Sequence, residues 1–350
     1  MRRREFVALF AGAAALWPQG ARSQQVPVIG FLSSATRSLE FTPQELADRR
    51  RRFGDGPLRP GAVPPSFRIG LNESGYVPGQ NVTIEVHAAG GDYDQLPALA
   101  ADLVRRKVNL IVSAGGLVSA QAARAATTTI PILFIAGTDP IRIGLVDSLS
   151  RPGGNATGVS VYFTELLAKR LELLRELVPG VRRVALLVNP NDFGTSIHVA
   201  DMEAVTAAAG LKLAVHYVSA ESEFEAAFAA AVRDPDRADA LLVSADPFFT
   251  TRRNEIVALA ARHSLPAIYP WREYAEIGGL MSYGPNIAEA YHEIGLYAGR
   301  ILKGASPGDL PVQLPKTFEL ILNLGTATAL GLTVPKLLYA RVDKVIGNPP

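Results

Sequence analysis

The 350-residue chain contains no cysteine, which excludes disulfides, thiolate nucleophiles and cysteine-ligated metal sites. Histidine is scarce, and its five occurrences form no HExxH or other metal-ligand spacing. The sequence also lacks the GxGxxG fingerprint of dinucleotide sites, the GxxxxGK[ST] phosphate loop and the GxSxG nucleophile elbow. Together these absences argue against a metal ion, a nucleotide cofactor and catalysis, so we expect neither a cofactor nor an enzyme.

Neither sign of charge dominates, because 35 basic and 33 acidic residues leave a net charge of +2. A nucleic-acid partner usually requires a basic domain or stripe, so none is expected. Hydrophobic residues make up 48% of the chain, which is ample material for a core. Single cores stop growing at roughly 250–300 residues, so the length favours two lobes.

The first 23 residues have the features of an export signal. Three arginines at 2–4 precede a short apolar stretch, and small residues at Ala21 and Ser23 suit cleavage after Ser23. The apolar stretch is shorter than the roughly 20 residues of a membrane span. Residues 3–7 (RREFV) fit a twin-arginine signal, with a Sec signal as the alternative. We expect a periplasmic protein; the alternative is a cytosolic chain with an amphipathic N-terminus.

One strand–loop pattern recurs four times: a short unbroken apolar run followed by small or polar turn residues. The runs lie at 28–32, 110–113, 184–188 and 241–244. Such runs are typical of strands buried on both faces of a parallel sheet. Helical segments alternate with them, so the sequence predicts an α/β fold of two Rossmann-like lobes. Ligands of open α/β sheets gather at the carboxyl ends of the strands, which favours a small molecule between the lobes.

The helix expected over 164–177 is the clearest, because five leucines share one of its sides and Pro179 stops it. The alternation of elements continues through most of the chain. Further helices are expected at 93–107, 119–127, 198–209, 221–233, 253–263, 287–302 and 326–330, and further strands at 130–136, 213–218, 267–269 and 318–322.

Residues 37–65 interrupt this alternation. They contain four consecutive arginines at 49–52, followed by a stretch rich in proline and glycine, and their apolar residues show no period. We expect an irregular or disordered insertion. The arginine run is interpreted as a solvated charge run, with a patch for an anionic partner as the alternative.

Several unusual strings resemble one known family. They are 2–6 (RRREF), 75–82 (GYVPGQNV), 150–158 (SRPGGNATG), 283–286 (YGPN) and 331–335 (GLTVP). They resemble the substrate-binding proteins of ABC transporters, the family that includes tryptophan- and other aromatic-amino-acid-binding proteins. The resemblance implies a type I periplasmic binding protein fold, no catalysis and delivery of the ligand to a membrane permease. The insertion departs from the family pattern and alters one wall of the expected ligand site.

The expected boundaries of the two lobes follow from the last predicted elements, at 287–302, 318–322 and 326–330. They come after the point at which the second sheet should be complete. We infer that the chain returns to the first lobe and crosses once more, which gives several hinge crossings. The first lobe is expected to comprise 26–157 and 282–308, and the second to comprise 159–280 and 317–346.

Four candidate ligand residues follow the first two strands of the first lobe. Ser33 and Ser34 end one strand, beside the expected cleft. Gly115 and Gly116 lie between a strand and a helix, where bare amides favour an anion such as a carboxylate. The alternative for the glycines is a tight turn that serves packing only.

Polar side chains follow three further strands. Thr138 can donate a hydroxyl, and Asp139 can accept from an ammonium or cap the next helix. Asn189 and Asp246 take the matching places in the second lobe. Asp246 can pair with a ligand amine, an interaction worth about 1.5–3 kcal/mol, or act as a helix N-cap.

Aromatic residues supply the remaining candidates. Tyr269 and Trp271 close a strand of the second lobe, and Ser282 and Tyr283 lie near an expected crossing. Aromatic faces with a polar edge suit an apolar or aromatic ligand. The alternative is that these rings belong to the core.

The sequence therefore predicts a periplasmic solute-binding protein whose lobes close on a small molecule. An aromatic or branched amino acid is the ligand that the family resemblance implies. Two other classes stay open at this point: a ligand-sensing module for a membrane receptor, which would use the same fold, and an exported α/β enzyme.

Overall fold

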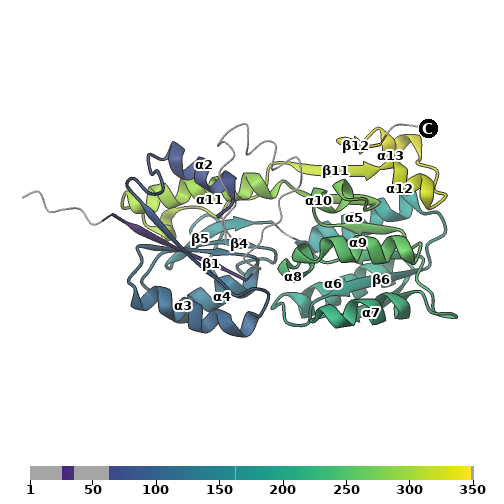
Figure 1. The fold of residues 1–350 in the computed structure, drawn as a ribbon, viewed down its shortest axis with the longest axis horizontal. Coiled ribbons are helices and arrows are strands. Elements are labelled where there is room, and N and C mark those ends of the chain that lie inside the picture. Colours follow the sequence, from purple (N-terminus) through teal and green to yellow (C-terminus); the bar gives the residue numbers. More distant parts are fainter. Residues whose placement is uncertain (1–25, 35–62, 162, 348–350) are drawn as a thin grey trace, which may run out of the picture.

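The computed structural model describes residues 26–34, 63–161 and 163–347, which form two lobes lying side by side (Figure 1). Each lobe is a sheet with helices on both faces. The predicted export signal and nearly all of the predicted insertion lie outside the described residues. Within the described part of the chain, no helix is long and apolar enough to cross a bilayer.

The sheet of the first lobe has five parallel strands in the order β2-β1-β3-β4-β5. Its three central strands consist largely of buried apolar residues, as the unbroken runs predict. The strands are β1 (Val28–Ser33), β2 (Thr83–Ala88), β3 (Leu110–Ala114), β4 (Ile132–Ala136) and β5 (Ala156–Ser160).

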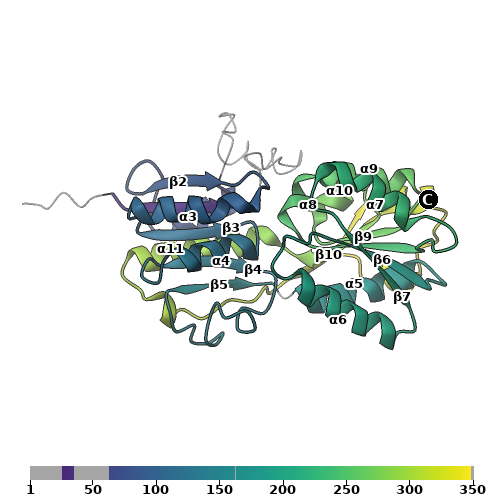
Figure 2. The ribbon, with the colours of Figure 1, turned by 90° about the horizontal axis from the view of Figure 1, so that it is seen from below.

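Two pairs of helices cover this sheet. On one face, α2 (Pro65–Glu73) packs beside α11 (Ile287–Leu302), and on the other α3 (Leu96–Arg105) packs beside α4 (Leu117–Ala126). Helices α3 and α4 lie below the strands in Figure 1 and in front of them in Figure 2, which is seen from below. A short 3₁₀ turn, Tyr93–Gln95, leads into α3.

Helices α2 and α11 touch backbone to backbone, and glycine allows it. A Cβ added at Gly295 of α11 would lie 2.3 Å from the carbonyl oxygen of Phe67, and one added at Gly70 of α2 would lie 2.1 Å from that of His292. Real Cβ atoms do not approach so closely. Helix α11 comes late in the sequence, yet it covers one face of the first sheet. At the two glycines its contact with α2 is made by backbone atoms.

The sheet of the second lobe has seven strands in the order β12-β11-β10-β9-β8-β6-β7, with only β10 and β11 antiparallel. Its central strands are again apolar and buried. The strands are β6 (Arg183–Val188), β7 (Lys212–Tyr217), β8 (Ala240–Val243), β9 (Ala267–Tyr269), β10 (Met281–Pro285), β11 (Phe318–Asn323) and β12 (Lys344–Ile346).

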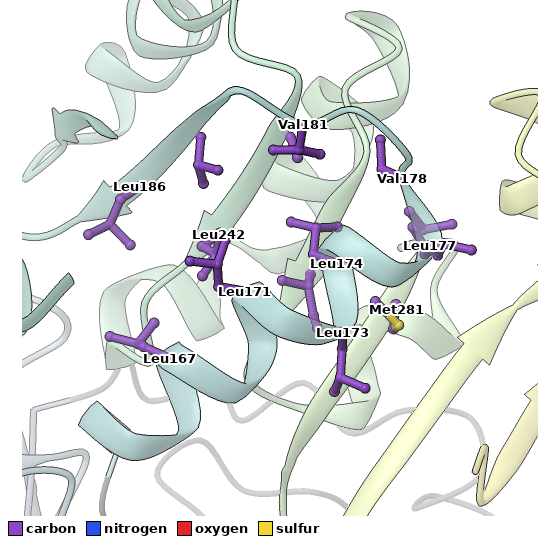
Figure 3. Packing of buried hydrophobic residues seen from close by; sticks show 14 of the residues in the cluster. Leu167, Leu171, Leu173, Leu174, Leu177, Val178, Val181, Leu186, Leu242 and Met281 are labelled. Carbon is purple, nitrogen blue, oxygen red and sulfur yellow. The ribbon is translucent and has the colours of Figure 1, made fainter. Parts of the chain in front are cut away.

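Helices also cover both faces of this second sheet. One face packs against α5 (Phe163–Leu177), α6 (Thr195–Ala208), α12 (Leu324–Ala329) and α13 (Lys336–Tyr339). The other packs against α7 (Phe224–Ala231), α8 (Pro247–Thr251), α9 (Arg253–Arg262) and α10 (Arg272–Glu276). Figure 3 shows the leucines of α5 lying over the strands, with Leu167 and Leu171 near Leu186 and Leu242.

The chain passes between the lobes three times: after β5, after β10, and between α11 and β11. The last passage lies along the edge of β5, where the amide of Ser160 donates to the carbonyl of Gln313 and the amide of Gln313 donates to that of Gly158, both at 2.9 Å. The expected division assigned 282–308 to the first lobe. Strand β10 instead pairs inside the second sheet, and α11 with the 3₁₀ turn Pro307–Asp309 packs on the first.

Every strand expected from an apolar run is present, as are the expected helices, with ends shifted by a few residues. Four strands were not expected: β2, β5, β10 and β12. Two of these, β2 and β12, are partly exposed edge strands, and β5 contains glycine and polar residues in place of an apolar run. Burial of β5 comes from neighbours that are distant in the sequence.

Candidate functional site

The facing sides of the two lobes meet at the ends of their strands. From the first lobe, Tyr93 reaches across, and its hydroxyl donates to both carboxylate oxygens of Asp246 at 3.2 Å. Beside this contact, Gly116 approaches the second lobe so closely that an added Cβ would lie 3.4 Å from Pro247. Two of the predicted strand-end residues, Gly116 and Asp246, thus lie where the lobes meet.

Asp246 caps helix α8, as one of the two sequence readings predicts. Its Oδ1 accepts from the amides of Phe248 at 2.9 Å and Phe249 at 3.4 Å. The same oxygen accepts from Nδ2 of Asn189 at 3.2 Å, which links the ends of β8 and β6. Capping takes only part of the acceptor capacity of this carboxylate, so it leaves a ligand role open.

A second carboxylate, Asp192, lies close to Asp246 in the loop after β6. Its Oδ1 accepts from the amide of Gly194 at 2.8 Å. Burial, together with the smaller effect of the neighbouring charge of Asp246, raises the pKa of Asp192 to about 7. Burial also raises the pKa of Asp246 to about 6, although hydrogen bonds from Asn189 and from the Phe248 amide lower it in part.

In the part of the chain that the structure describes, no basic side chain pairs with either of these acids. Among the described residues, neither Asp192 nor Asp246 forms an ion pair with lysine, arginine or histidine. Nor does the described part of the chain hold a group of three or more His, Cys, Asp or Glu side chains placed to bind a metal ion. Buried carboxylates without a cation are costly, so the pair is suited to a ligand that carries positive charge.

A second set of contacts joins the lobes at the loop after β4. The hydroxyl of Thr138 lies 3.1 Å from Nε2 of His198, on α6. Burial lowers the pKa of His198 to about 4, so the ring is neutral near pH 7. Arg142, in the same loop as Thr138, pairs with Asp201 of α6 at 3.5 Å. Thr138 thus engages the other lobe directly.

The remaining candidates of the first lobe lie at strand ends. Gly115 and Gly116 have φ of +78° and +86° and precede α4, and the hydroxyl of Ser34 donates to the Gly115 carbonyl. Ser33 ends β1 beside them. Asp139 forms a local turn, its Oδ1 accepting from the Ile141 amide at 2.9 Å.

The aromatic candidates divide into two kinds. Half-buried Trp271 packs against core residues of both lobes, and so does Tyr283, whose ring stacks on Phe318. Tyr269 is 1% exposed and stacks on Tyr274 in the core of the second lobe, as its alternative reading predicts.

Ser282 is buried in β10, and its hydroxyl has no hydrogen-bond partner among the described residues. Its ligand role, like those of the other candidates, stays a prediction.

Five residues of this interface were not among the sequence candidates: Tyr93, Arg142, Asp192, His198 and Asp201. Asp192 belongs to the polar turn that also holds Asn189, so the strand-end rule could have included it. Tyr93 and His198 were assigned only to expected helices. Nothing in their local sequence indicates that they face the opposite lobe.

The raised carboxyl pKa values predict how stability depends on pH. Above the unfolded value of 3.8 and below about 7, folded Asp192 holds more proton than unfolded Asp192. Its contribution to the free energy of unfolding therefore falls as pH rises through this window. We expect Asp192→Asn to stabilise the ligand-free protein at pH 7.5, on the order of 1 kcal/mol or more, and to change it little at pH 4.

Urea unfolding of the parent and the variant at several pH values measures this difference. Asp239→Asn is a suitable control, because Asp239 precedes β8, at the end away from Asp246. Among the described residues it accepts only from the amides of Arg182 and Arg183. An Asp192→Asn curve that runs parallel to the parent curve from pH 4 to 7.5 would contradict the assignment.

Comparison with known proteins adds three kinds of relative. The family model described as "ABC transporter substrate binding protein" matches residues 65–346. A curated "Tyrosine-binding protein" of Clostridioides difficile (strain R20291) is 29% identical over 281 residues, which are 79% of this chain and 80% of that protein.

Two solved structures share the fold. One is an ABC domain in complex with L-Trp from Streptococcus pneumonia, with a TM-score of 0.76 and 25% identity, covering 91% of this chain and 99% of that chain. The other is a conserved domain protein from Vibrio cholerae, with a TM-score of 0.77 and 24% identity, covering 92% and 100%. The expected type I periplasmic binding protein fold is confirmed.

Proposed function

This chain belongs to the ABC transporter substrate-binding protein family, and we propose that it captures an amino acid between its two lobes. A solute-binding role follows from the family, which is one of binding proteins and not of enzymes. The relatives described as binding tyrosine and L-Trp support an amino acid as the solute. In the proposed mechanism, the lobes separate to admit the ligand and close around it.

The observation that carries the proposal is the pair of buried carboxylates, Asp192 and Asp246, that lacks a cation among the described residues. An ammonium group has three donors, and both carboxylates keep acceptor positions beyond the bonds already described. Held between them, the α-ammonium of an amino acid would compensate the buried negative charge. The hydroxyl of Tyr93 would close the site from the first lobe.

The other end of the amino acid has a suitable partner in the first lobe. Gly115 and Gly116 leave the backbone bare at the start of α4, a ten-residue helix whose first amides favour a carboxylate. Trp271 and Tyr283, which pack against both lobes, would line the space for an apolar or aromatic side chain.

Export and delivery complete the proposed function. The family consists of extracytoplasmic binding proteins, in agreement with the signal expected at residues 1–23. We infer that the mature chain works in the periplasm and hands its ligand to a membrane permease of an ABC transporter. Localisation of the full-length chain with and without the Arg3→Lys/Arg4→Lys change would separate twin-arginine from Sec export.

Isothermal titration calorimetry with a panel of solutes tests the ligand class. The panel contains L-tyrosine, L-tryptophan, L-leucine, their deaminated acids and glucose. We expect at least one amino acid to bind, and its deaminated acid to bind at least tenfold more weakly, because a charge-assisted hydrogen bond contributes about 1.5–3 kcal/mol. Binding of a deaminated acid as tight as that of its amino acid, or of glucose alone, would refute the proposal.

A further inference from the structure

Helix α11 brings a tyrosine side chain to the start of α4. The helix begins at Ile287, just after β10 ends at Pro285, so its first turns lie beside the passage between the lobes (Figure 1). In these turns, the ring of partly buried Tyr291 packs against the core of the first lobe. A hydrogen bond joins its hydroxyl oxygen to the backbone of Gly115, the residue that follows β3. Tyr291 therefore reaches the place where the carboxylate of the proposed ligand would bind.

This hydroxyl differs from two others near the start of α4, which already donate to backbone carbonyls. Ser34 donates to the carbonyl of Gly115, and Ser119 donates to that of Ala114 at 2.8 Å. The hydroxyl of Tyr291 accepts from the Gly115 amide and donates to no acceptor among the described residues. A phenol has one hydrogen to donate, so that of Tyr291 is available to a ligand.

The surroundings of this hydroxyl favour a charged acceptor. Burial raises the pKa of Tyr291 to about 12, although the hydrogen bond from Gly115 lowers it in part, so the hydroxyl keeps its proton at neutral pH. A buried donor without an acceptor costs free energy, and a bond to a charged group is stronger than one to a neutral group. A carboxylate at the start of α4 would meet both requirements.

We propose that Tyr291 is a ligand-binding residue that recognises the carboxylate of the solute, with its hydroxyl donating to one carboxylate oxygen beside the bare amides of α4. The proposal rests on the proposed function in one respect, namely that the solute carries a carboxylate. It gives the two ends of an amino acid different partners: Tyr291 for the carboxylate, and Asp192 with Asp246 for the ammonium. Each end can then be tested by itself.

The change Tyr291→Phe removes the hydroxyl and keeps the ring, so the packing in the first lobe is preserved. Calorimetry compares three probes: the amino acid of the panel that binds best, its deaminated acid, and the amine left when its carboxylate is removed. For L-tryptophan these are indole-3-propionate and tryptamine. We expect the variant to bind the amino acid and the deaminated acid about ten- to hundredfold more weakly than the parent does. The amine should bind both proteins alike.

The matched control is Tyr297→Phe, the same change on the same helix. The hydroxyl of Tyr297 donates to the carbonyl of Pro311 and accepts from Nε2 of Gln313, both at 2.7 Å, so its hydrogen is already used within the protein. This variant should bind all three probes as the parent does. Melting curves of the ligand-free proteins show whether each variant is folded.

The proposal would be overturned if Tyr291→Phe binds the amino acid as tightly as the parent, or if Tyr297→Phe loses as much affinity. Equal losses for the amino acid and the amine would also overturn it, since Tyr291 would then support the fold and not contact the carboxylate. A parent that binds neither carboxylate probe would refute this proposal and the proposed function together. Failure of the ammonium site alone is distinguishable, because the deaminated acid then binds as tightly as the amino acid while Tyr291→Phe still weakens both.

Discussion

Asp246→Asn is expected to weaken amino-acid binding by about 10- to 100-fold while leaving the fold intact. The loss follows because the amide nitrogen of asparagine replaces Oδ2 and cannot accept from the ammonium, so a charge-assisted hydrogen bond worth about 1.5–3 kcal/mol is lost. Asparagine is as good an N-cap as aspartate, so α8 should keep its cap on Phe248. The change therefore separates the ligand role of Asp246 from its structural role.

The affinity measured by calorimetry should fall for the amino acid but hardly at all for its deaminated acid, since only the former carries an ammonium. Asp239→Asn, at the far end of β8, should bind as the parent does. If Asp246→Asn weakens both compounds alike, the effect is structural and the ammonium assignment fails. Melting curves of the ligand-free variants show whether the fold is retained.

Gly295→Val is expected to cost about 3 kcal/mol or more of folding free energy. The added Cβ would lie 2.3 Å from the Phe67 carbonyl oxygen and 2.7 Å from the Leu71 amide nitrogen, both backbone atoms of α2. Backbone cannot rotate away as a side chain does, so α2 must move off α11 and expose the core beneath. Overpacking alone typically costs about 1–3 kcal/mol.

The change in unfolding free energy caused by Gly295→Ala gives a second test, because the close contact and helix propensity predict opposite signs for it. In an uncrowded helix, Gly→Ala stabilises by about 1 kcal/mol through helix propensity. Gly295→Ala should nevertheless destabilise, because its Cβ has no room. Ala288→Val, at an exposed position on the same helix, controls for the β-branched side chain. Urea unfolding measures all three, and a Gly295→Ala variant more stable than the parent would contradict the close contact.

Sequence patterns predicted the strands of the two sheets where burial is complete. The runs at 110–112 and 184–188 are apolar throughout because both of their faces are covered by helices. Strand β5 was not predicted, because it has no apolar run. Gly158 and its polar neighbours are buried by α11 and by the segment that contains Gln313. Such cover depends on contacts between distant parts of the chain, which no local pattern contains.

The candidate site was predictable only up to the strand ends. The rule that ligands gather at the carboxyl ends of parallel strands singled out Thr138, Asn189 and Asp246. Thr138 and Asp246 bond to the opposite lobe, and Asn189 bonds to Asp246. The rule could not say which side chains meet across the interface. Tyr93 reaches Asp246 from a 3₁₀ turn before α3, a position fixed by how the lobes dock.

The late return of α11 to the first lobe bears on how the protein is made. Domains of a nascent chain usually fold in order from the N-terminus. Here the five-stranded sheet has all its strands by residue 160, yet the helix that packs with α2 over one face ends only at Leu302. The second sheet is likewise incomplete until β11 and β12 have been synthesised. The first lobe therefore completes its cover only after most strands of the second lobe have been synthesised.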